Sequence, residues 1–96
     1  MQVYSHDVTA RLWVARLIVS QKTAEKLAGR HGLDWQDVRD VVVCVAGLRY
    51  AWHDHPERGR RALVEVEIRG RQCLVVLYPV DDSSGDVYAL GSAYPI

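Results

Sequence analysis

Within residues 62–70, ALVEVEIRG, the apolar Val64, Val66 and Ile68 alternate with the charged Glu65, Glu67 and Arg69. This period of two predicts a strand with one face buried and the other in water. Gly70 predicts the turn of a hairpin into residues 73–78, CLVVLY, whose unbroken apolar run is typical of a central strand covered on both faces. Pro79 cannot donate to a ladder and should end that strand. Residues 87–94, VYALGSAY, predict a further strand.

The N-terminal half shows helical spacing instead. Residues 20–45 indicate two short helices hinged at residues 30–32. Ser20 predicts the N-cap of the first helix, and Gly32 predicts its left-handed C′ residue. A narrow stripe at i, i+3, i+4 and i+7 should face the core, formed by Ala24, Leu27, Ala28 and His31.

The second helix has its own start signals. Asp34 predicts its N-cap, Asp37 occupies the N3 position of a capping box, and Leu33 can pack on Val38 as a hydrophobic staple. The helical spacing then continues through valines, at Val38, Val41, Val42 and Val45. Because β-branched residues are poor helix formers, a strand at 41–46 is the alternative interpretation.

The remaining segments are less regular. Residues 11–19 are rich in Trp, Val, Leu and Ile and predict a strand. Residues 1–10 carry little pattern and are either a flexible lead or an edge segment. Residues 47–61 contain Pro, Gly and many charges, which predicts a loop with a short edge strand at 49–53. Residues 81–86, DDSSGD, predict another loop.

This order of elements predicts one α+β domain over residues 1–96. A strand and two helices precede a three- to four-stranded antiparallel meander, and the helices pack on one face of the sheet. The sequence is 49% hydrophobic and 25% charged, as expected for a globular protein rather than a disordered one. No apolar run approaches the roughly 20 residues that span a bilayer, and no signal peptide is evident at the N-terminus, so we expect a cytoplasmic protein without membrane contact.

The charge is balanced overall but uneven along the chain. The formal net charge is zero, which argues against strong non-specific binding of nucleic acid. Five arginines lie close together in sequence, at Arg58, Arg60, Arg61, Arg69 and Arg71. Arginine suits carboxylates and phosphates alike, so this bias does not choose between them. Cys44 and Cys73 both lie among apolar residues, where a free thiol is usually buried, and a disulfide is not implied.

A family resemblance rests on residues 24–42, AEKLAGRHGLDWQDVRDVV, and on the later strand pattern that ends in DVYALGSAY. Together with the element order, these segments resemble the BrnT-like branch of the RelE/ParE toxin superfamily over roughly residues 15–94. Members typically carry a basic residue and His-Gly before the second helix, and a Ser-Ala-Arg-like segment on the last strand. Here that segment is Ser92-Ala93-Tyr94, so the terminal basic residue is missing.

The resemblance implies a bacterial toxin–antitoxin setting, with RNA cleavage opposed by an antitoxin protein. Metal-independent cleavage of RNA needs a base, an acid and cations that stabilise the phosphorane. We therefore name a candidate catalytic set, formed by His31, Arg69, Arg71 and Tyr94. A second set is a candidate surface for RNA or for an acidic partner segment, formed by Arg58, Arg60, Arg61 and Tyr78. No cofactor and no metal are expected.

Each candidate also has a purely structural interpretation. His31 can simply satisfy a hydrogen bond at the helix end, arginines beside a turn are usually only solvated, and the two tyrosines can be packing residues. His53 and His55 have a spacing that can share a metal on a strand, but a third ligand is lacking. Cys73 lies in an apolar run that disfavours its thiolate. The alternative function is a non-enzymatic protein-interaction module on the same scaffold.

Overall fold

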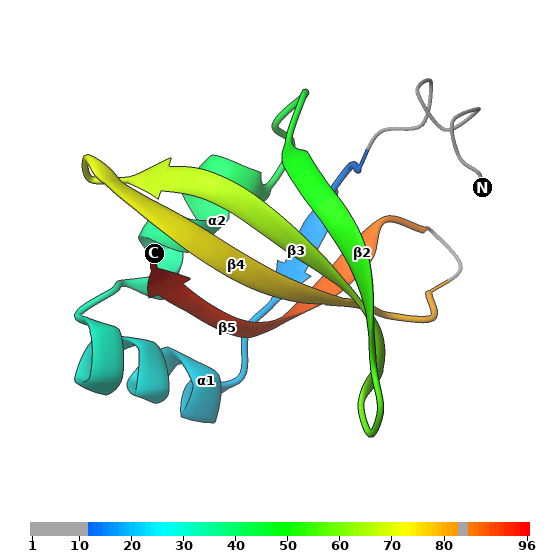
Figure 1. Ribbon diagram of the computed structural model, residues 1–96, viewed down its shortest axis with the longest axis horizontal. Coiled ribbons are helices and arrows are strands. Elements are labelled where there is room, and N and C mark those ends of the chain that lie inside the picture. Colours follow the sequence, from blue (N-terminus) through cyan, green and yellow to red (C-terminus); the bar gives the residue numbers. More distant parts are fainter. Residues whose placement is uncertain (1–11, 83–84) are drawn as a thin grey trace.

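The computed structural model in Figure 1 describes residues 12–82 and 85–96. Its elements follow in the order β1 (Arg16–Ile18), α1 (Gln21–Lys26), the π-helical turn η2 (Leu27–His31), α2 (Trp35–Val42), β2 (Arg49–His55), β3 (Gly59–Ile68), β4 (Arg71–Pro79) and β5 (Val87–Pro95). The predicted α+β class and the order of strand, helices and meander are confirmed. The prediction for residues 1–10 lies outside the described residues.

The described strands form one sheet in the order β1-β5-β4-β3-β2. Strands β2 to β5 are an antiparallel meander, whereas β1 pairs in parallel with β5. This parallel pair is short, since Arg16–Ile18 meet only residues 87–89 of β5. Beyond it, α1 and η2 lie along β5 (Figure 1), and they cover the strand edge that β1 leaves open.

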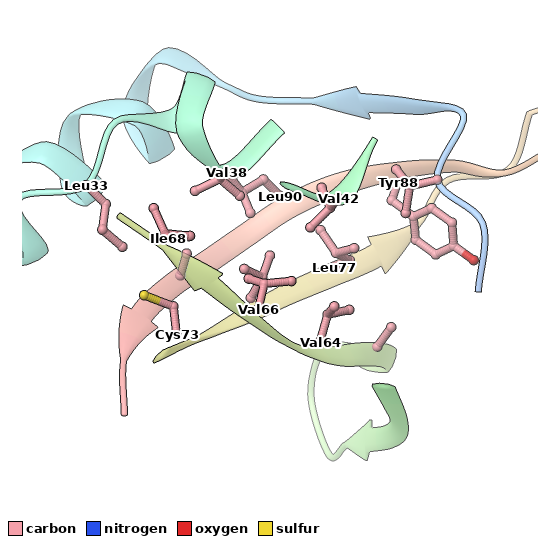
Figure 2. Packing of buried hydrophobic residues seen from close by; sticks show 14 of the residues in the cluster. Leu33, Val38, Val42, Val64, Val66, Ile68, Cys73, Leu77, Tyr88 and Leu90 are labelled. Carbon is pink, nitrogen blue, oxygen red and sulfur yellow. The ribbon is translucent and has the colours of Figure 1, made fainter. Parts of the chain in front are cut away.

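The hydrophobic core lies between α2 and one face of the sheet. Val38 and Val42 are fully buried and point from α2 toward β3 and β4 (Figure 2). The inward residues of the sheet fall at alternate positions, as the period of a strand requires, at Val64, Val66, Ile68, Cys73, Val75 and Leu77. Leu27 is the residue of η2 that reaches this core.

The opposite face of the sheet is turned away from α2, and we call it the open face. The strand registers place on it the residues that alternate with the core, namely Arg49 and His53 of β2, Arg61, Leu63 and Glu65 of β3, Leu74, Val76 and Tyr78 of β4, and Ser92 and Tyr94 of β5. Most of these side chains are half-buried or exposed. The open face is therefore the surface of the sheet on which side chains can meet a ligand.

The predicted helix starts are confirmed. The side chain of Ser20 accepts a hydrogen bond from the Thr23 N–H (3.1 Å), and that of Asp34 accepts one from the Gln36 N–H (2.8 Å). Gly32 ends η2 with φ 63° in the left-handed region, as predicted.

The second helix ends earlier than its apolar spacing predicted. The helix stops at Val42, because Val43 turns extended and bridges to Val14 beside it. Cys44 follows at φ 57° and is exposed, so the expectation of a buried thiol is wrong for Cys44 and confirmed for Cys73. Tertiary pairing with residue 14 overrides the helical spacing that continued to Val45.

Two further predictions need correction. Residues 47–61 are not mainly a loop, since β2 runs to His55 and β3 begins at Gly59. Strands form there despite the charged residues, because β3 supplies a pairing partner for every residue of β2. The predicted core-facing stripe of the first helix also holds only in part: Leu27 is buried, but Ala28 is exposed.

Candidate functional site

The open face carries a fixed arginine at the start of β3. Arg61 Nε–H donates to His53 Nδ1 on β2 (3.1 Å), and Arg61 Nη1 donates to Tyr78 Oη on β4 (3.3 Å). His53 pairs directly with Arg61, and Tyr78 follows Leu77, which is the β4 partner of Ala62. The guanidinium fork is thus held at two points, and its remaining N–H groups can meet an anion in two-point geometry.

Arg61 differs from other arginines of the described chain in what holds it. Three arginines lie against carboxylates: Arg39 on Asp40, Arg49 on Glu65 and Arg69 on Asp37. Arg61 is held by an imidazole nitrogen and a phenol oxygen, which are neutral acceptors. Its positive charge is therefore positioned without being cancelled, which is the condition for binding an external anion.

Tyr78 packs against the backbone of β5. Gly91 leaves room for its ring, since a methyl group there would overlap Tyr78 Cε2 and lie 2.9 Å from Cδ2. Burial raises the pKa of Tyr78, but hydrogen bonding and positive charge from Arg61 and Arg58 outweigh burial and leave that pKa below its ordinary value. The phenol is accordingly a better proton donor than an isolated tyrosine.

The turn between β2 and β3 brings Arg58 to the same end of the sheet. His55 Nδ1 accepts from the backbone N–H groups of Glu57 and Arg58, at 3.1 Å each. Desolvation lowers the pKa of His55, and the charges of Arg61 and Arg58 lower it further. A neutral His55 therefore orders this turn, and its role is structural.

Arg60 is separated from the other predicted binding residues. Adjacent strand residues face opposite sides of the sheet, and Arg60 stacks over the Trp52 ring at 4.5 Å instead of joining Arg61. The structure thus brings together three residues of the predicted binding set, Arg58, Arg61 and Tyr78, and separates Arg60 from them. The sequence did not reveal this division, because the charged run that holds these arginines predicts a loop, in which faces do not alternate.

The predicted catalytic set divides in a similar way. His31 of η2 and Tyr94 of β5 come together, with ring centroids 6.1 Å apart and planes tilted by 42°. Arg69 lies in the β3–β4 turn, where Arg69 Nε–H donates to Asp37 of α2 (2.7 Å) and this contact raises the pKa of the guanidinium. Arg71 is exposed and pairs with Ile68, a core-facing position, so the register does not direct it to the open face.

Sequence reasoning missed three contributors to the open face. His53 was considered only as a metal ligand, although it holds Arg61. Gly91 was assigned no functional role, and Ser92 was considered only as part of the segment that resembles Ser-Ala-Arg, although both line a small hollow beside His31. A glycine inside a strand often marks a close approach of other groups, and that signal could have identified Gly91.

Two observations concern metal-ligand groups and long apolar helices in residues 12–82 and 85–96. No group of three or more His, Cys, Asp or Glu side chains there is arranged to hold a metal ion. No helix in this part of the chain is long and apolar enough to cross a membrane.

Comparison with known proteins gives no family for this chain. No family model, curated protein or solved structure matches it.

Proposed function

We propose that the chain binds single-stranded RNA on the open face and cleaves it without a metal, as a toxin-like domain of a bacterial cytoplasmic toxin–antitoxin system. One observation carries this proposal: the Arg61 guanidinium is fixed between His53 and Tyr78 and forms no salt bridge with a carboxylate of the described residues. The resemblance of residues 24–42 to BrnT-like toxins supports the same reading. An antitoxin protein is then the expected partner.

The proposed reaction uses the RNA as its own nucleophile. The 2′-oxygen attacks phosphorus, the bond from phosphorus to the 5′-oxygen breaks, and the products are a 2′,3′-cyclic phosphate and a 5′-hydroxyl. Arg61 and Arg58 stabilise the negative charge of the phosphorane. Tyr78 donates its proton to the departing 5′-oxygen, and the 2′-hydroxyl proton passes to water. Arg61 also stabilises the phenolate that remains, consistent with the lowered pKa of Tyr78.

The first test is cleavage of RNA by the purified chain in the presence of a metal chelator, together with growth of cells that express it. Tyr78→Phe keeps the ring over Gly91 and removes only the proton donor, so we expect a loss of cleavage by a factor of about 10² to 10⁴. Tyr50→Phe, on the core side of β2, is the matched control and should retain activity. Full activity of Tyr78→Phe would refute the role of Tyr78 as the acid. His31 and Arg71 would then be the candidate catalytic residues to test.

The pH profile gives an independent test. An acid must be protonated to act, so cleavage should decline as the pH rises through the pKa of Tyr78, which lies below the ordinary value of 10. Arg61→Gln removes a cause of the lowering, so the pKa of Tyr78 and the alkaline limb should both move to higher pH. Tyrosinate absorbance, taken as the difference from Tyr78→Phe, measures that pKa directly. An alkaline limb that stays in place would show that Tyr78 is not the acid.

A specific observation favours a second function, a protein-interaction module. Strand β2 is an edge of the described sheet, and Trp52 on it is 39% exposed with Arg60 stacked on its ring. An edge strand can accept a strand from a partner, and Trp and Arg are frequent anchors of interfaces. A wild-type chain that neither arrests growth nor cleaves RNA, but binds a co-expressed neighbouring protein through Trp52, would establish this alternative.

A further inference from the structure

A small hollow lies between the first helix and β5. Its volume is about 60 Å³, and it is lined by Thr23, Lys26, Leu27, Arg30, His31, Gly91 and Ser92. One water molecule needs roughly 10–15 Å³ of such space, so the hollow can take a compact group of several heavy atoms. The helix is beside β5 because β1 ends early and leaves that strand edge open (Figure 1).

The lining of this hollow is cationic. Lys26, Arg30 and His31 contribute basic side chains, and none of the residues that line the hollow is a carboxylate. Within the described part of the chain, neither Lys26 nor Arg30 forms an ion pair. The hollow therefore has uncompensated positive charge, and a compact anion is the ligand that this charge favours.

Hydroxyl groups add directional hydrogen bonding. Thr23 Oγ1 accepts from Ser20 Oγ (3.0 Å), so its own proton remains available to another acceptor. Ser92 brings a second hydroxyl from β5. His31 is half-buried and packs near Tyr94, which limits its ring to one side of the hollow. Cations combined with hydroxyl donors are the groups that bind phosphate in proteins.

Gly91 joins this hollow to the site at Tyr78. One side of Gly91 lies under the Tyr78 ring, and Gly91 with Ser92 also lines the hollow. We infer that the hollow binds a second phosphate of the same RNA strand, neighbouring the phosphate held by Arg61. This inference rests on the proposed function and deepens it, because two fixed phosphate sites would select an extended single strand over a mononucleotide.

The salt dependence of RNA affinity tests the inference. A fluorescently labelled single-stranded RNA is titrated with wild-type protein and with the double variant Lys26→Gln/Arg30→Gln over a series of salt concentrations. Losing one phosphate contact should reduce the magnitude of the slope of log K against log salt by about 0.7. A matched control, Lys22→Gln/Arg16→Gln, removes one lysine and one arginine that do not line the hollow. The slope of this control should lie closer to the wild-type slope than the slope of Lys26→Gln/Arg30→Gln does.

The position of the second contact is tested separately by nuclear magnetic resonance. The His31 ring signals should shift when RNA is added to wild-type protein and should shift less in Lys26→Gln/Arg30→Gln. Equal slopes for the hollow variant and the matched control, with RNA affinity still weakened by Arg61→Gln, would overturn this inference and leave the proposed function intact. Absence of RNA binding by the wild-type protein would overturn both.

Discussion

At the scale of single residues, the chemistry of the arginines depends on the acceptor that holds each one. Arg69 is tied to Asp37 and serves the packing of a turn on α2, whereas Arg60 lies on an indole ring. Arg61 is held by neutral acceptors and keeps its charge for a ligand. Adjacent residues of one charged run therefore have different roles, because strand alternation sends them to different faces.

Replacing Gly91 should change both the position of the Tyr78 ring and the stability of the fold, and the two effects can be measured separately. Gly91→Ala places a methyl group against the Tyr78 ring, so we expect the ring to move, the contact with Arg61 to weaken and the pKa of Tyr78 to change. Such overpacking typically costs about 1–3 kcal/mol. Denaturant unfolding and tyrosinate titration measure the two effects.

Gly29→Ala is the matched control for this substitution. No side chain or backbone atom outside its own helix lies within 4 Å of a methyl group at position 29, and its backbone is not left-handed. Alanine is a better helix former than glycine by up to about 1 kcal/mol, so Gly29→Ala should be neutral or stabilising. An unchanged titration of Tyr78 in Gly91→Ala would contradict the close packing of the ring on β5.

At the scale of elements, α2 shows where local signals are sufficient and where they are not. Its start is set by the Asp34 side chain, which satisfies the Gln36 N–H, and this signal is visible in the sequence. Its end at Val42 is set by pairing of the next residue with Val14, which is distant in sequence. The helix is therefore three residues shorter than its apolar spacing predicted.

The cap of α2 gives the prediction at this scale. Asp34→Ala removes the acceptor for the Gln36 N–H and should lower the free energy of unfolding by about 1 kcal/mol. Asp40→Ala removes the same charge from the exposed side of the same helix, where it forms an exposed ion pair with the neighbouring Arg39, and should change stability by much less. Thermal unfolding of the two variants distinguishes them. Equal losses would mean that net charge, and not the cap, stabilises the helix start.

At the scale of the whole molecule, one face of the sheet is used for stability and the other is available for function. The core-facing side of β4 is fully buried at Leu77, while Leu74 on the open face is half-buried. The helix α2 covers the first face, whereas Tyr78 and Arg61 on the second face are only half-buried. Variants of the open face should therefore affect binding more than folding.

Leu77 and Leu74 test this division on a single strand. Leu77→Ala leaves a cavity in the core and should cost about 2–5 kcal/mol, which lowers the melting temperature by several degrees per kcal/mol in a domain of this size. Leu74→Ala loses less buried area and should cost distinctly less. Comparable costs would show that the open face is also packed against something in solution.

The sequence by itself determined the α+β class, the order of elements, the helix caps at Ser20 and Asp34 and the left-handed Gly32. These features depend on neighbours within a few residues, where periodicity and capping act. The sequence also selected most residues of the candidate site, including Arg58, Arg61 and Tyr78.

Only the tertiary structure decided which of those residues meet. The register between strands places Arg61 between His53 and Tyr78, and alternation along β3 sends Arg60 to the other face. Parallel pairing of β1 with β5 leaves a strand edge that the first helix covers, and this brings His31 beside Tyr94 and Ser92. Contacts between residues far apart in sequence depend on register and packing, which no local pattern of the chain encodes.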